Sequence, residues 1–171
     1  NCRPPNVYEK SNANFSQQIM DLSVDANGRN GNSGAIGIDF LGCEGTAFQC
    51  VAIDAEGAFA GIKHGLGSGG GMHDLTVIGG QYGAYIPVSQ PTCSFSHATF
   101  KGQTVACVYN NTRGPLVMPG AVFEPAPGAR AILCAGGSQN PYNAGLALID
   151  ARIEMPEGSV QPAIETDRSV Y

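Results

Sequence analysis

The sequence predicts an all-β fold, in which short parallel strands stack into a solenoid of about six rungs. A short apolar pattern returns six times, beginning at residues 21, 50, 74, 97, 120 and 150, in steps of 23 to 30 residues. A period of this length, with a strand-like pattern in each repeat, is typical of stacked β-repeats. No repeat holds about ten residues at helical spacing. The 24 Gly and 11 Pro supply the turns that many short strands need.

The recurring pattern is the first strand expected in each repeat. It reads DLSV, CVAI, DLTV, HATF, GAVF and DARI along the chain. Residues two positions apart lie on the same side of a strand, so the alternating apolar residues are expected to face the interior. A further apolar residue precedes each pattern by two positions and marks a third edge of the repeat. These residues are Ile19, Phe48, Met72, Phe95, Met118 and Leu148.

A second strand is expected later in each repeat, where a small residue is followed by an aliphatic one. These segments span residues 35–38, 60–62, 84–86, 106–108, 131–133 and 163–164. Turn residues such as Asn27-Gly28 and Gly79-Gly80 separate the two strands. Neighbouring rungs would then lie about 4.8 Å apart, with ladders of Ile, Val, Leu and Phe filling a narrow interior.

The bulk composition fits a single domain over residues 1–171. That this domain is a fragment, or one part of a larger assembly, is a further interpretation. Hydrophobic residues make up 43% and charged residues 13%, so the chain has the means to form a core. No apolar run approaches the roughly 20 residues that cross a bilayer, so no membrane partner is expected. The net charge is −5 and the nine cations are scattered, which argues against nucleic-acid binding.

The six Cys suggest disulfides formed in an oxidising compartment, and therefore a secreted, extracellular protein. Buried free thiols are the alternative interpretation. Two sequons, which begin at Asn14 and Asn110, predict N-glycosylation. There is no C-x-x-C spacing, and the three His do not cluster with the Cys, so no metal site is expected. We expect no cofactor.

The stretch from Gly67 to Ala84, GSGGGMHDLTVIGGQYGA, resembles a rung of the pectate-lyase-like superfamily. It is most similar to the β-helix of laminarinase-type exo-β-1,3-glucanases, and SGAIGIDF at residues 33–40 resembles an earlier rung. The resemblance covers roughly residues 14–110. It implies a right-handed parallel β-helix and hydrolysis of a β-glucan-like polysaccharide by paired carboxylates. The matching residues lie in turns and core positions, so no catalytic position is transferred.

Carboxylates in equivalent positions of different repeats are the candidate catalytic residues. Asp21 and Asp74 would lie two rungs apart, about 9.6 Å, and Asp25 and Asp54 one rung apart, about 4.8 Å. Inverting glycosidases hold their two carboxyls about 6.5–9.5 Å apart and retaining ones about 5–5.5 Å. The alternative is that these acids are solvated or cap turn amides.

Tyr82, Tyr85 and Tyr109 fall in or near the second strand of their repeats and would form an aromatic strip that binds sugars. The alternative is simple edge packing. His64, beside the Gly-rich loop, is the fourth candidate binding residue. Asp39 and Lys63 occupy equivalent positions of adjacent repeats, where a surface ion pair is expected.

The resemblance therefore implies an extracellular protein of the glycoside hydrolase type that acts on a polysaccharide of the β-glucan type. A polysaccharide lyase is the alternative class of enzyme. The alternative function is non-catalytic: a structural, adhesive or glycan-binding β-helix. Its open ends would accept a second copy or a partner β-helix, since uncapped terminal rungs expose strand edges.

Overall fold

The computed structural model describes residues 14–67, 69–87, 93–112, 114–134 and 145–166. This part of the chain holds fifteen β-strands and one three-residue 3-10 helix, η1 (Gly28–Asn30), and no α-helix. The prediction of an all-β fold is therefore confirmed. In these residues no helix has the length and apolar character that crossing a membrane requires.

The strands form two sheets in which every pair is parallel. The first sheet, sheet A, contains β1 (Gln18–Asp25), β3 (Ala47–Asp54), β5 (Gly71–Ile78), β7 (Ser94–Ser96), β8 (Thr99–Lys101), β10 (Leu116–Pro119), β11 (Val122–Glu124), β13 (Leu146–Ile149) and β14 (Arg152–Ile153). The second, sheet B, contains β2 (Ile36–Leu41), β4 (Ala60–Gly65), β6 (Tyr82–Ile86), β9 (Ala106–Asn110), β12 (Arg130–Cys134) and β15 (Ile164–Thr166).

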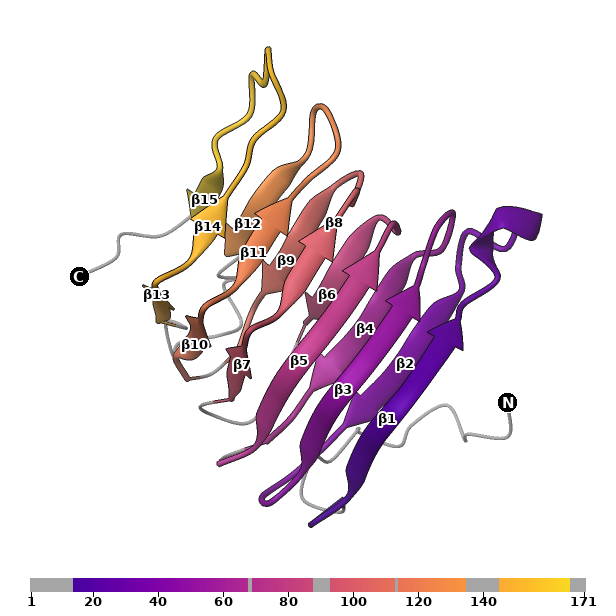
Figure 1. The fold of residues 1–171 in the computed structure, drawn as a ribbon, viewed down its shortest axis with the longest axis vertical. Coiled ribbons are helices and arrows are strands. Elements are labelled where there is room, and N and C mark those ends of the chain that lie inside the picture. The colour runs from indigo at the N-terminus through magenta and orange to yellow at the C-terminus, as the bar shows by residue number, and fades with distance from the viewer. Residues whose placement is uncertain (1–13, 68, 88–92, 113, 135–144, 167–171) are drawn as a thin grey trace.

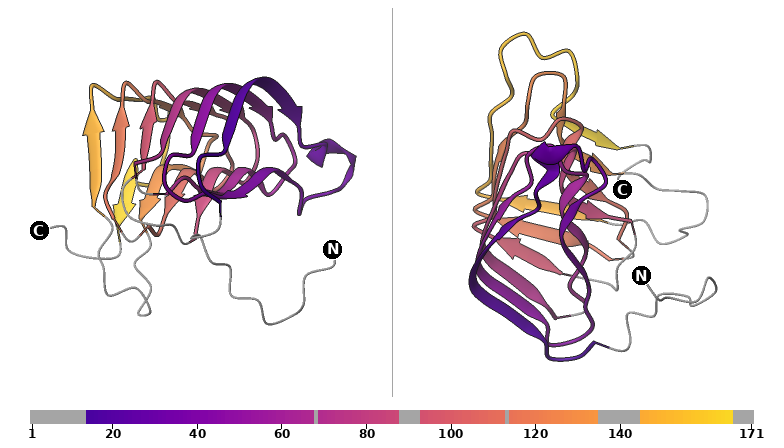
Figure 2. Two further views of the ribbon diagram at one scale, coloured as in Figure 1. Left: turned by 90° about the horizontal axis from the view of Figure 1, so that it is seen from below. Right: turned by 90° about the vertical axis from the view of Figure 1, so that its right-hand side faces the viewer.

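The chain alternates between the two sheets, once in each sequence repeat (Figures 1 and 2). Each strand pairs with the equivalent strand of the next repeat, so Leu22 lies opposite Val51 and Val51 opposite Leu75. Equivalent apolar side chains are therefore stacked, as the sequence predicted. The architecture is compatible with a solenoid of the parallel β-helix type.

The first residue of each recurring pattern is a left-handed bend rather than the start of a strand. Asp21, Cys50, Asp74, His97 and Asp150 have φ between 51° and 53°, and Gly120 has φ 65°. Residues other than Gly, Asn and Asp rarely adopt this left-handed backbone conformation. Its recurrence at the same position of each repeat therefore indicates that the backbone must turn a corner there. β1, β3 and β5 run through the bend, whereas the later repeats break there into two strands. The strands of the first three repeats consequently begin earlier than the sequence predicted.

Aromatic and aliphatic ladders fill the core between the sheets. Ile53, Val77, Phe100 and Phe123 follow one another in register along sheet A, and the rings of Phe100 and Phe123 stack with centroids 5.8 Å apart. Sheet B meets this ladder with small residues at Gly37, Gly61 and Gly83. A Cβ atom added at Gly61 would lie 2.3 Å from the Val77 side chain. The two sheets therefore lie close together along this glycine column.

One prediction about covalent chemistry needs correction, and a second stays a prediction. No disulfide joins two of the cysteines that lie within the described residues; Cys2 lies outside them. Cys93 and Cys107 are core thiols, and burial raises the pKa of each to about 12. Asn110 is also buried, and its side-chain oxygen accepts hydrogen bonds from Thr112. Glycosylation at Asn14 and Asn110 stays a prediction. The half-buried Asn14 donates its side-chain amide to the Leu41 carbonyl over 2.8 Å.

Candidate functional site

The predicted catalytic residues and the predicted binding residues lie on different sheets. Asp21 and Asp25 belong to β1, Asp54 to β3 and Asp74 to β5, all in sheet A. The tyrosines and His64 belong to strands of sheet B, on the other side of the shared core. The structure therefore does not bring these two sets of residues together into one site.

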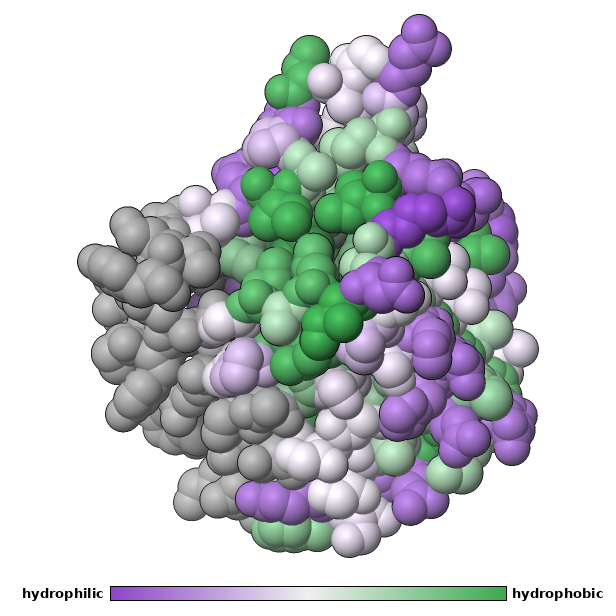
Figure 3. Space-filling view, turned by 60° about the vertical axis from the view of Figure 1, so that its left-hand side comes forward, coloured by the Kyte–Doolittle hydropathy of each residue, from purple (hydrophilic) through white to green (hydrophobic). Residues whose placement is uncertain are grey.

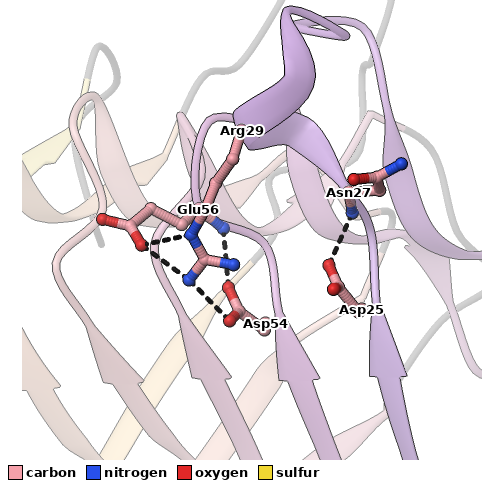
Figure 4. A network of polar contacts seen from close by, with 5 residues as sticks. All are labelled: Asp25, Asn27, Arg29, Asp54 and Glu56. Carbon is pink, nitrogen blue, oxygen red and sulfur yellow. Dashed lines mark hydrogen bonds and ion pairs between the residues drawn. The ribbon is translucent and has the colours of Figure 1, made fainter.

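Asp25 and Asp54 lie opposite each other in register, as predicted, but their carboxylates are already engaged (Figure 4). Arg29, from η1, donates to Asp54 over 2.7 Å and to Glu56 over 2.8 Å. Asp25 accepts the backbone N–H of Asn27 over 2.7 Å, which closes a turn. The hydrogen bond from Arg29 lowers the pKa of Asp54, so Asp54 is held as a carboxylate and is unsuited to donating a proton.

Replacing Arg29 should raise the pKa of Asp54 towards its ordinary value. In Arg29→Gln the largest cause of the lowered pKa is gone, so Asp54 should take up its proton at a higher pH than in the wild type. A carboxyl group whose pKa is lowered by folding stabilises the folded state above its unfolded-state pKa, and this contribution is lost as the pH falls. The free energy of unfolding of the wild type should therefore fall more steeply on acidification than that of the variant. Carboxyl NMR titration measures the shift, and Lys101→Gln, which touches Glu124 instead, is the control. An unchanged Asp54 titration would contradict the assignment.

Asp21 and Asp74 occupy the left-handed bend of their repeats, with Cys50 at the same position between them. All three side chains are exposed. Asp74 Oδ1 lies 3.9 Å from Nδ1 of His97, at the bend of the next repeat. A short polar residue tolerates left-handed backbone, so the bend accounts for these aspartates without catalysis.

The outer face of sheet B carries a cluster of four half-buried aromatic side chains, Phe59, Tyr82, Tyr85 and Tyr109, which we call the aromatic cluster. Tyr85 and Tyr109 stack with ring centroids 4.7 Å apart and an interplanar angle of 21°. Phe59 lies in the turn before β4 and meets Tyr82 and Tyr85 at 5.4 and 5.0 Å. Rings from three repeats thus meet on one surface.

A polar group adjoins the aromatic cluster. Asp39 Oδ1 lies 2.7 Å from His64 Nδ1, and Asp39 Oδ2 accepts a hydrogen bond from Lys63 Nζ over 3.3 Å. His64 is buried, with 3% of its surface exposed, whereas Asp39 is exposed. Lys63 is opposite Tyr85 in the sheet register, so this carboxylate and its two basic partners border the rings directly.

These residues belong to one column that runs across sheet B. The register places Asp39, Lys63, Tyr85, Tyr109, Leu133 and Glu165 in successive strands. At the far end Arg130 donates to Glu165. The column therefore has a charged pair near each end and aromatic and aliphatic surface between them.

Sequence reasoning missed one residue and one contact of this surface. Phe59 falls in a turn, where only its position one residue before the second strand hinted at a role. The Asp39–His64 contact joins positions 25 residues apart, and no sequence pattern links the two residues. Among the described residues, no three His, Cys, Asp or Glu side chains are close enough to hold a metal ion.

Comparison with known proteins gave no relative. No family model, no curated protein and no solved structure matches the chain.

Proposed function

We propose that this protein is a right-handed parallel β-helix of six turns that binds an extracellular polysaccharide on the outer face of sheet B. The observation that carries the proposal is the aromatic cluster, with the Asp39–Lys63–His64 group beside it. Ligand sites typically combine apolar and aromatic surface with a few well-placed polar groups. The regular alternation of the chain between two sheets of parallel strands supports the β-helix assignment. The secreted location is proposed from the polysaccharide-binding role alone.

The arrangement favours a polymer over a small sugar. The cluster draws rings from three repeats, and its column continues through Leu133 to Glu165, so an extended ligand contacts several strands at once. The charges also favour a neutral polysaccharide such as a β-glucan. Asp39 is matched by Lys63, and Glu165 by Arg130, which leaves no cationic surface for uronates in this column.

Tyr85→Ala should weaken polysaccharide binding by about tenfold, which corresponds to ~1.4 kcal/mol. Tyr85 contacts the other three rings of the cluster, so its removal disrupts the whole surface. Calorimetry with laminarin, pectate and alginate measures the effect, and laminarin should bind most tightly. Ile78→Ala, an exposed apolar truncation on sheet A, is the control and should bind like the wild type. Equal binding by both variants would place the ligand elsewhere, and no binding of any glycan would end the proposal.

Hydrolysis of the polysaccharide is the second candidate function, favoured by the register of Asp25 and Asp54. The two residues lie one strand spacing apart, near the carboxyl separation of retaining glycosidases. Arg29 keeps Asp54 ionised, as a nucleophile requires, and Asp25 is the second carboxyl of the pair. Reducing-end and unsaturated-product assays on the same three polysaccharides test this function, with Asp25→Asn as the inactive variant. Product formation that survives Asp25→Asn would exclude this pair.

A further inference from the structure

The column on the outer face of sheet B has a regular spacing. It takes one residue from each strand of the sheet, and all six are exposed or half-buried: Asp39, Lys63, Tyr85, Tyr109, Leu133 and Glu165. Neighbouring strands lie about 4.8 Å apart, so the column presents a side chain at this interval along the axis of the stack. A polymer that lies along the column must therefore repeat at nearly the same interval.

The rings of the aromatic cluster use their faces on one another. Tyr85 and Tyr109 stack, so each ring covers one face of the other. Phe59 and Tyr82 also contact Tyr85, with ring centroids 5.0 and 4.9 Å away. Within the part of the chain that the structure describes, the hydroxyls of Tyr82 and Tyr85 have no hydrogen-bond partner. A sugar on this surface therefore meets ring edges and phenol hydroxyls more than open ring faces.

The charged pairs near the two ends of the column suit neutral hydroxyls. Lys63 Nζ lies 3.3 Å from Asp39 Oδ2, and Arg130 donates to Glu165 at the other end. A sugar hydroxyl both donates and accepts, so it can bind the acid and the base of such a pair together. The interior residue Ile164 is 38% exposed at the end of the stack, where Figure 3 shows apolar side chains gathered, whereas Glu165 beside it belongs to the column. The column itself therefore ends on a polar group.

Linkage decides which polysaccharides repeat at the strand interval. In a β-1,4-linked hexose chain, successive residues extend in a nearly straight line, and each advances by about the distance between neighbouring strands. Its hydroxyls lie along the edges of a flat ribbon, where they can reach the groups of the column. A β-1,3-linked chain winds into a helix and leaves a surface of this kind after a few residues.

We propose that the ligand of sheet B is a β-1,4-linked chain that lies along the column, parallel to the axis of the stack, with one sugar residue over each strand. This inference rests on the proposed polysaccharide-binding function and narrows it to one linkage and one direction. The phenol hydroxyls and the charged pairs bind the sugar hydroxyls, and the six strands of sheet B provide six successive subsites.

Calorimetry with hexasaccharides of the two linkages tests the ligand class. Cellohexaose should bind about tenfold more tightly than laminarihexaose. From cellobiose to cellohexaose the affinity should rise with each added residue, because each residue reaches another strand. Laminarihexaose that binds as tightly as cellohexaose, or an affinity that stops rising at the disaccharide, would overturn this inference and leave polysaccharide binding intact. If neither hexasaccharide nor laminarin binds, the proposed function itself is wrong.

Two substitutions test the direction of the chain and the kind of contact. Leu133 lies two strands from Tyr85, so Leu133→Ala should weaken cellohexaose binding by about threefold, whereas a chain that ran along β6 would not reach it. Tyr85→Phe keeps the ring and removes the hydroxyl, and should weaken binding by about fivefold. Circular dichroism confirms that each variant folds, and Ile78→Ala on sheet A is again the control. Wild-type affinity in Leu133→Ala would overturn the direction, and wild-type affinity in Tyr85→Phe would overturn recognition through the hydroxyls.

Discussion

Gly83→Val should destabilise the protein by about 3 kcal/mol or more, a loss that corresponds to a Tm lower by roughly 6–12 °C. A Cβ atom at this position would lie 2.4 Å from Cδ1 of Phe100 and 2.6 Å from the carbonyl oxygen of Cys107. Phe100 is fully buried and stacked on Phe123, so its ring has no space to move into. The second contact is with backbone, so β6 and β9 would have to separate.

Gly34→Val is the matched control for that substitution. Gly34 lies before β2, and a Cβ atom there would meet nothing within 4 Å. Gly34→Val should change the free energy of unfolding by no more than about 0.5 kcal/mol. Thermal and urea unfolding of both variants measure the difference. If the two glycines tolerated valine equally, the close approach of the sheets along the glycine column would be wrong.

Gln103→Glu should cost roughly 3–5 kcal/mol at pH 7, which is the range for an unpaired buried charge. Gln103 lies in the turn between β8 and β9 and is fully buried. Its side-chain Nε2 donates to the carbonyls of Val77, Gly79 and Lys101 at 3.1, 2.9 and 3.1 Å. A glutamate would remove these donors and turn a negative charge towards three carbonyl oxygens.

The pH dependence of this variant has a definite sign. Burial without a partner should raise the carboxyl pKa in the folded state above the unfolded value of about 4.3. The folded state then binds the proton more tightly, so stability should fall as the pH rises from about 4.3 to the folded-state pKa, by ~1.4 kcal/mol for each pH unit. Gln103→Met, which removes the donors without adding charge, should lose about 1–3 kcal/mol with no added pH dependence. Equal pH profiles for the two variants would show that position 103 is not enclosed.

The interior of this fold was accessible from the sequence because it repeats. Leu22, Val51 and Leu75 recur in the same local pattern, and parallel stacking puts such residues opposite one another without further information. Equivalent outward positions were also predicted, since Asp25 lies opposite Asp54 and Asp39 opposite Lys63. The bend at Asp21 and its equivalents was not predicted, because a residue that starts a pattern and one that turns a corner look alike in sequence.

The chemistry of the outer faces depended on contacts that no periodicity describes. Asp54 was one of the candidate catalytic carboxylates, and only the structure shows that Arg29, from the preceding repeat, lies against it. His64 was a candidate binding residue on its own, and the structure adds Asp39 and Lys63 beside it.

The sequence alone determined the repeat, the parallel strands and the apolar ladders, since burial imposes the same residue types at the same position in each repeat. Only the tertiary structure decided which polar and aromatic side chains meet. Those contacts depend on turn lengths and on the sheet to which each strand belongs, and for this reason the predicted carboxylates and the tyrosines lie on different sheets.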